Sequence, residues 1–261
     1  MAETKTAIAN KPAWVDLSTT DAAGARDFYA KVFGWKIEVN PDPQYGGYGM
    51  AEVGGKTVAG IGPKMAPEAP TAWSLYIATD DADAVAKKVQ ESGGKVVAPP
   101  FDVGSQGRMA TFQDPIGAFI SVWQPKGFAG DFPVGQANTF GWAELDAQGI
   151  DKAAPFYQKV FGWSPKKTEM GEGAQPYTEF QIAGDSIAGG MELGPNAPAQ
   201  IPNFWLVYFA VEDVDKSTNK ATAAGAKEMM APQDFPGGRF SVLTDPQGAV
   251  FGLLKTNPRP Q

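Results

Sequence analysis

The chain carries the same sequence pattern twice, and this repeat limits its fold more than any other feature. The stretch FYAKVFGW at residues 28–35 returns as FYQKVFGW at residues 156–163, and DPIGA at residues 114–118 returns as DPQGA at residues 245–249. The two copies keep their order, and a length of 261 residues is typical of about two domains. We therefore expect two homologous units at residues 11–125 and 139–255, joined by a linker at residues 126–138.

Each unit is expected to contain two similar halves, each made of a strand, a helix and three further strands. Asp21 is a typical helix N-cap, the apolar residues between 28 and 33 follow helical spacing, and Gly34 is typical of a helix end. The expected helices lie at 21–33, 81–92, 151–161 and 214–224. The expected strands lie at 14–18, 35–38, 47–53, 56–62, 74–79, 96–98, 108–113, 118–124, 142–146, 206–211, 239–244 and 249–255. This order of elements, four times over, predicts an α+β fold of four β-α-β-β-β modules.

The linker between the two units is rich in glycine and proline and lacks any periodic apolar pattern. It contains two phenylalanines, Phe128 and Phe132, which predict that it packs against the body of the protein. Because the repeat lets one chain supply both members of a pair of units, we expect a monomer or a weak homodimer.

The composition removes several classes of function. The chain has no cysteine, which excludes disulfides and thiolate nucleophiles, and no histidine, which excludes a Ser-His-Asp triad. Its net charge of −7 is unsuited to nucleic acid, because phosphate binding needs clustered lysine and arginine. No apolar run approaches the roughly 20 residues of a membrane helix, and the first residues lack a secretory signal. We expect a soluble, cytoplasmic protein.

The four modules, with FYxKVFGW at the end of the first helix and DPxGA before the last strand, resemble the vicinal oxygen chelate superfamily. This superfamily includes glyoxalase I, extradiol dioxygenases, fosfomycin-resistance enzymes and bleomycin-resistance proteins. The two-unit layout is similar to that of actinobacterial glyoxalase-like proteins. The resemblance implies mixed sheets that curve into two cups, and its best-known members hold a divalent metal ion in such a cup.

The positions that carry metal ligands in the superfamily hold unsuitable residues in this chain. In the first and second units respectively, the resemblance places these ligands at Trp14 and Trp142, at Ser74 and Leu206, and at Ser121 and Gly252. A remaining position falls around residues 61–62 and 190–192, where Glu192 is the one residue able to ligate well. Indole, leucine and glycine side chains do not coordinate divalent cations. We therefore expect neither a metal ion nor another cofactor.

Strand alternation predicts which side chains line the cups, because every second residue of a strand faces the same side. The predicted lining is Trp14, Asp16, Ser74, Tyr76, Ser121 and Trp123 in the first unit, and Trp142, Glu144, Asp146, Leu206 and Tyr208 in the second. Aromatic rings, carboxylates and small side chains together suit a flat aromatic or hydrophobic ligand. By analogy with paired relatives, each cup is expected to combine the first strand of one unit with later strands of the other.

Each candidate also has a structural interpretation. Asp16 and Glu144 are expected either to form ion pairs with Arg108 or Arg239, or to act as a polar anchor or general base. The two tryptophans would fill the space of the lost metal, and Tyr76 and Tyr208 would be core aromatics. For Arg108 and Arg239 themselves, salt bridges with Asp102 and Asp234 are favoured over anion binding.

Four functions remain open at this point. The favoured one is a metal-independent protein that binds a small aromatic or hydrophobic molecule. The alternatives are a metal-independent lyase, isomerase or cyclase with Asp16 or Glu144 as base and Tyr76 or Tyr208 as acid, a glyoxalase-like metalloenzyme that uses Glu192, and a protein-interaction module.

Overall fold

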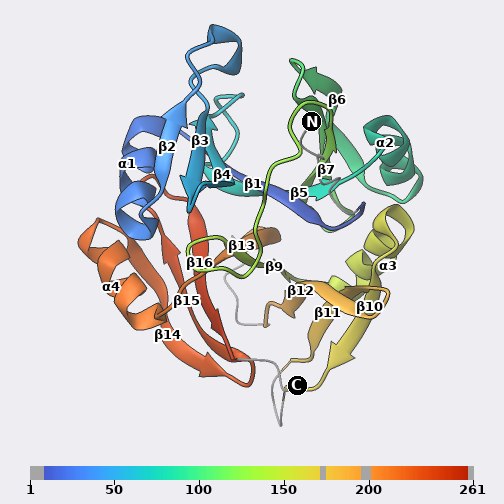
Figure 1. Ribbon diagram of the computed structural model, residues 1–261. Helices are drawn as coiled ribbons and strands as arrows, with labels where there is room; N and C mark the ends of the chain where they lie inside the picture. The colour runs from blue at the N-terminus through green and yellow to red at the C-terminus, as the bar shows by residue number, and fades with distance from the viewer. Residues whose placement is uncertain (1–8, 171–174, 195–200, 258–261) are drawn as a thin grey trace. The chain divides into compact units, whose positions relative to one another are not determined.

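The computed structural model describes residues 9–170, 175–194 and 201–257, and these form the predicted four β-α-β-β-β modules (Figure 1). The helices are α1 (Ala22–Phe33), α2 (Ala82–Glu91), α3 (Ile150–Phe161) and α4 (Val214–Ala223), with a short 3₁₀ helix at Pro43–Tyr45. The strands of the N-terminal half are β1 (Pro12–Thr19), β2 (Lys36–Val39), β3 (Gly49–Val53), β4 (Lys56–Pro63), β5 (Ala72–Ala78), β6 (Lys95–Val103), β7 (Gly107–Gln113) and β8 (Phe119–Pro125). Those of the C-terminal half are β9 (Phe140–Ala147), β10 (Ser164–Thr168), β11 (Tyr177–Ile182), β12 (Asp185–Glu192), β13 (Phe204–Ala210), β14 (Lys227–Phe235), β15 (Gly238–Thr244) and β16 (Val250–Thr256).

The helices begin and end where the sequence predicts. Asp21 accepts a hydrogen bond from the Gly24 amide at the start of α1, and Gly34 ends this helix in the left-handed conformation with φ 71°. Asp81 and Asp213 cap α2 and α4 in the same way. Among the described residues, no helix is both long enough and apolar enough to cross a membrane.

The strands form two mixed sheets, each drawn from one half of the sequence. Their orders are β2-β3-β4-β1-β5-β8-β7-β6 and β10-β11-β12-β9-β13-β16-β15-β14. β1 runs parallel to β4, and β5 runs parallel to β8; β9 with β12 and β13 with β16 repeat these pairings.

Backbone hydrogen bonds also join the first strand of each half to the fifth. Asn10 N donates to Ala78 O (2.8 Å) and Ala78 N donates to Lys11 O (2.9 Å), which connects the start of β1 to the end of β5. Asn138 and Thr139 make the same pair of bonds with Ala210.

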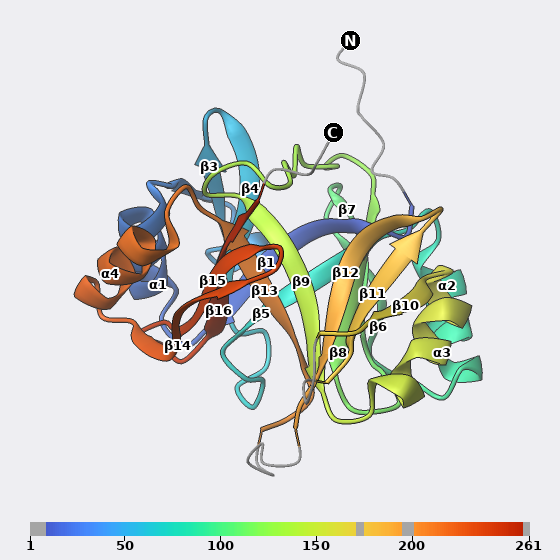
Figure 2. The same cartoon turned by 90° about the horizontal axis from the view of Figure 1, so that it is seen from below.

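The chain nevertheless divides into two compact units that each combine modules from both halves. These compact units are not the two sequence repeats, and from here on they are called unit 1 and unit 2. Unit 1 comprises residues 1–14, 75–129 and 143–206, and unit 2 comprises residues 15–74, 130–142 and 207–261. In unit 2 helices α1 and α4 lie side by side, and in unit 1 α2 lies beside α3 (Figures 1 and 2).

The two repeated motifs meet in the core of each unit. In unit 2 the Tyr29 hydroxyl donates to Asp245 Oδ2 (3.0 Å) and accepts from Trp73 Nε1 (2.9 Å). In unit 1 the Tyr157 hydroxyl donates to Asp114 Oδ2 (2.7 Å) and accepts from Trp205 Nε1 (2.9 Å). All six side chains are buried. The tyrosine of FYxKVFGW in one half therefore binds the aspartate of DPxGA in the other half.

Candidate functional site

The predicted site residues divide between the two compact units. Unit 1 holds Trp14, Tyr76, Ser121, Trp123, Glu144, Asp146 and Leu206, and unit 2 holds Asp16, Ser74, Trp142 and Tyr208. Three local arrangements stand out: an aromatic cluster and a carboxyl pair in unit 1, and a tyrosine–aspartate pair in unit 2.

The aromatic cluster joins Trp14 of β1, Trp123 of β8 and Phe128 of the linker. Trp14 is 6% exposed, and its ring meets the Phe128 ring edge-on at a centroid distance of 5.2 Å. Trp123 Nε1 donates to Phe128 O (2.9 Å), and its ring also approaches the Phe128 ring edge-on, at 6.4 Å. The Trp123 ring lies directly over Gly107, where an added Cβ would come within 2.3 Å of it.

Phe128 is not among the site residues predicted from the sequence. The prediction that the linker packs against the body is confirmed, and the two phenylalanines in a segment otherwise rich in glycine and proline were the available signal. Two predicted ligand-binding residues, Trp14 and Trp123, are thus brought together, with a side chain of the chain itself against both.

The carboxyl pair is formed by Glu144 and Asp146, which lie two residues apart on β9 and so face the same side. Their side chains are hydrogen-bonded to each other. Burial first, and then the charge and hydrogen bond of Glu144, raise the pKa of Asp146 to about 9. Asp146 therefore keeps its proton at neutral pH, and a neutral carboxyl group can donate a hydrogen bond as well as accept one. Strand alternation predicted that the two side chains share a face, but it did not predict the raised pKa of Asp146.

The N-terminal half has a tyrosine–aspartate pair of which one member corresponds to Glu144. Asp16 stands where Glu144 stands in the repeat, and its Oδ2 accepts a hydrogen bond from the Tyr48 hydroxyl (3.2 Å). The Tyr48 side chain packs on Gly60 and Gly62 of β4. A Cβ added at Gly60 would lie 1.7 Å from the Tyr48 hydroxyl, and a Cβ added at Gly62 would lie 2.8 Å from the Tyr48 ring. Tyr48 is not among the site residues predicted from the sequence. The signal was the tyrosine at the same place in both halves, Tyr48 before β3 and Tyr177 at the start of β11.

The remaining predicted residues have mainly packing roles in the described contacts. Ser121 Oγ shares a hydrogen bond with Thr111 Oγ1 (2.9 Å) and lies opposite Tyr76 in the β5–β8 register. The Tyr208 ring covers Gly252, where an added Cβ would come within 2.1 Å of it. Leu206 is 2% exposed and belongs to the core. Ser74 and Trp142 are partly exposed.

The two arginines bind aspartates near the start of the neighbouring helices. Arg108 binds Asp102 (3.1 Å) as predicted and Asp83 of α2 (2.8 Å), and Arg239 binds Asp234 (2.9 Å) as predicted and Asp215 of α4 (2.7 Å). These guanidinium groups lower the pKa of Asp83 and Asp215. Each guanidinium group thus joins its predicted partner on the preceding strand, Asp102 or Asp234, to an aspartate of a helix.

The donor groups do not fit a divalent metal ion of the superfamily type. Glu192, the best candidate ligand, accepts hydrogen bonds from the Gly149 amide (2.7 Å) and the Ile150 amide (3.0 Å) and so caps α3, which has no side-chain cap of its own. Trp14 and Ser121 are engaged with Phe128 and Thr111. Nowhere in the described ranges do three or more His, Cys, Asp or Glu side chains gather as a metal site would require.

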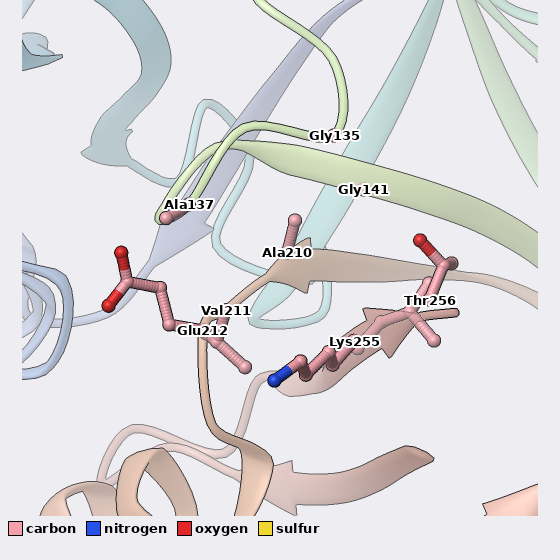
Figure 3. A pocket seen from close by; sticks show the side chains of 9 residues that line it. Gly135, Ala137, Gly141, Ala210, Val211, Glu212, Lys255 and Thr256 are labelled. Carbon is pink, nitrogen blue, oxygen red and sulfur yellow. The ribbon is translucent and has the colours of Figure 1, made fainter. Parts of the chain in front are cut away.

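A pocket of about 220 Å³ opens in unit 2 (Figure 3). It is lined by Gly135, Ala137, Gly141, Ala210, Val211, Glu212, Leu254, Lys255 and Thr256. Its rim carries the exposed charges of Glu212 and Lys255, and none of the predicted ligand-binding residues lines it. Its volume lies below the roughly 300 Å³ at which the usual range of pockets for drug-sized ligands begins.

Comparisons with known proteins agree with this architecture. The model of the Glyoxalase/Bleomycin resistance protein/Dioxygenase superfamily matches residues 11–122 and again residues 139–253. The chain is 45% identical over 253 residues to the putative glyoxylase CFP32 of Mycobacterium tuberculosis, with 95% of both chains covered. It is 37% identical over 258 residues to the anthracycline biosynthesis protein DnrV of Streptomyces peucetius, covering 94% of this chain and 92% of that one.

Solved structures share the fold at low sequence identity. The Mn(II)-bound glyoxalase of Novosphingobium aromaticivorans superposes with a TM-score of 0.65 at 17% identity, over 94% of this chain and 81% of that one. The 2,3-dioxygenase LapB of Pseudomonas sp. KL28 superposes with a TM-score of 0.66 at 14% identity, over 96% and 93%. At these identities the likeness concerns the fold alone.

Proposed function

Since the chain belongs to the Glyoxalase/Bleomycin resistance protein/Dioxygenase superfamily, we propose that it is a metal-independent member that binds a planar aromatic or hydrophobic small molecule. One observation carries the proposal. Trp14, at the position of the first metal ligand, packs edge-on against the Phe128 ring at 5.2 Å. The same side chain thus replaces a metal ligand and already accommodates an aromatic ring, and edge-to-face contacts of this kind are favourable.

The relatives support an aromatic ligand. The name of the Streptomyces relative refers to anthracycline biosynthesis, and an anthracycline has a planar core of fused rings. Because the two chains are 37% identical over nearly their whole length, we expect this protein to bind a planar ligand of similar shape.

The test is a binding titration of the full chain with an anthraquinone sulfonate, followed by native mass spectrometry and by the metal content of the purified protein. We expect saturable binding at one molecule per chain and no stoichiometric metal. The matched variants are Trp14→Phe, which keeps a ring, and Trp14→Leu, which keeps apolar volume without one. Only the leucine variant should lose affinity, by about tenfold. A stoichiometric divalent metal, or equal binding by both variants, would overturn the proposal.

The carboxyl pair favours a second candidate function, a metal-independent lyase, isomerase or cyclase. The protonated Asp146 would donate a proton to the substrate while Glu144 accepts one, a division of roles that a hydrogen-bonded carboxyl pair permits. Turnover of a bound aromatic substrate that is lost in Asp146→Asn and in Glu144→Gln, while binding persists, would establish this candidate. Unchanged turnover in both variants would remove it.

A further inference from the structure

Phe128 is held in place by its main chain on both sides. Its amide donates to Gln106 O (2.9 Å), and its carbonyl accepts from the Trp123 indole (2.9 Å). The preceding residue, Gly127, donates to Ser105 O (3.0 Å) at a distance that leaves no room for a side chain, because an added Cβ would lie 2.8 Å from that oxygen. The β6–β7 turn and β8 therefore fix the position of the Phe128 main chain.

The Phe128 ring occupies the aromatic cluster without being sealed into it. Trp14 and Trp123 are 6% and 9% exposed, whereas Phe128 is half-buried. Glycines flank it at 127 and 130, and Gly130 has a φ of 73° that a residue with a side chain rarely adopts. Phe128 thus lies in a short irregular segment, and a rotation of its side chain is enough to take the ring out of the cluster while the main-chain bonds stay in place.

The hydrogen bond between the Trp123 indole and Phe128 has no equivalent at the matching position of the C-terminal half. The residue of β16 that corresponds to Trp123 is Leu254, which has no indole N–H to bind a carbonyl. The fold of the second copy is the same without it, so the fold itself does not require the Trp123–Phe128 bond.

We propose that Phe128 is a built-in occupant of an aromatic subsite formed by Trp14 and Trp123, and that a planar aromatic ligand binds there by displacing it. This inference rests on the proposed function and adds its regulation. The phenyl ring makes with Trp14 the contact that a ligand ring would make. Because the ligand binds only the open state, its apparent affinity is reduced by the fraction of molecules in which Phe128 has left.

Removing the phenyl ring should remove this competition. In Phe128→Ala, the full chain is expected to bind the anthraquinone sulfonate about tenfold or more tightly than the unmodified protein. The matched control is Phe132→Ala, which deletes the other linker phenylalanine, whose ring packs on Phe140 in unit 2 at 5.1 Å. This control should leave the affinity unchanged, and adding Trp14→Leu to Phe128→Ala should abolish the gain.

A second measurement covers the case in which Phe128→Ala does not fold. The unmodified sequence is labelled with para-fluorophenylalanine, and the Phe128 resonance is assigned by its loss in Phe128→Leu. Saturation with the probe should move this resonance to the position of a solvent-exposed ring. An unmoved resonance, equal affinity of Phe128→Ala and the unmodified protein, or an equal gain in Phe132→Ala would each overturn the displacement. If Trp14→Leu weakens binding of the probe but Phe128→Ala does not change it, the proposed function holds and the displacement is refuted. If no variant binds the probe, both the proposed function and the displacement are refuted.

Discussion

The phenol of Tyr29 donates a hydrogen bond to the buried carboxyl group of Asp245, 3.0 Å away and 216 positions along the chain. Tyr157 and Asp114 repeat this bond at 2.7 Å in the other compact unit. In each case the tyrosine lies on the first helix of one half and the aspartate in the last turn of the other. The two repeated motifs, FYxKVFGW and DPxGA, therefore connect modules that are far apart in the sequence by a buried hydrogen bond.

The hydrogen bond between Tyr29 and Asp245 predicts the effect of removing the Tyr29 hydroxyl group. In Tyr29→Phe the buried Asp245 and the Trp73 indole each lose a partner, and we expect the free energy of unfolding to fall by about 2–4 kcal/mol. Urea denaturation of the full chain measures this. Tyr45→Phe, in the partly exposed 3₁₀ turn, is the control and should change little. Equal effects of the two substitutions would show that the hydrogen bonds of the Tyr29 hydroxyl do not stabilise the fold.

The glycine under Tyr48 predicts a steric effect. A Cβ at Gly60 would lie 1.7 Å from the Tyr48 hydroxyl, so Gly60→Ala must push the ring away from Asp16 and should cost about 1–3 kcal/mol. Tyr48→Ala opens the space, and the double substitution should therefore cost less than the sum of the two single ones. Gly194→Ala, where nothing lies within 4 Å of the new Cβ, is the control. Additive costs in the double variant would contradict the arrangement.

The sequence could predict the modules because their signals are local. Asp21 caps its helix three residues away, and the Arg108–Asp102 pair closes a hairpin across six residues. Strand alternation likewise placed Asp146 on the face of Glu144.

The parts of the site that could not be predicted depend on distant partners or on burial. Tyr48 reaches Asp16 across 32 positions, and Phe128 reaches Trp14 from the linker. The raised pKa of Asp146 follows from its burial beside Glu144, and burial is a property of the folded chain.

The cap on α3 predicts what Glu192 does. In Glu192→Ala the Gly149 and Ile150 amides lose their acceptor, and the free energy of unfolding should fall by about 1–2 kcal/mol. Because this role is structural, added Mn(II) should shift the melting temperature of the variant and of the unmodified protein equally. A Mn(II) shift present only with Glu192 would instead make this residue a metal ligand. The control for the loss of a negative charge is Glu169→Ala, because the Glu169 side chain is exposed.

The carboxyl pair predicts how stability depends on pH. The pKa of Asp146 is raised to about 9 in the folded chain, whereas an unfolded aspartate has a pKa of about 3.9. The folded state therefore binds a proton between these values that the unfolded state has released, so the stabilisation is complete below about pH 4 and is lost as the pH rises through about 9. One such proton contributes a slope of at most about 1.4 kcal/mol per pH unit.

Asp146→Asn removes this titration and should make the free energy of unfolding fall less steeply between pH 5 and pH 8 than in the unmodified chain. Asp114 and Asp245, whose pKa values burial also raises, titrate in both proteins, so the difference between the two curves isolates Asp146. Urea titrations at a series of pH values give these curves, and Asp185→Asn, at an exposed position, should reproduce the unmodified one. Parallel curves for Asp146→Asn and the unmodified chain would mean that the pKa of Asp146 is not raised in the folded chain, and the acid–base candidate would lose its support.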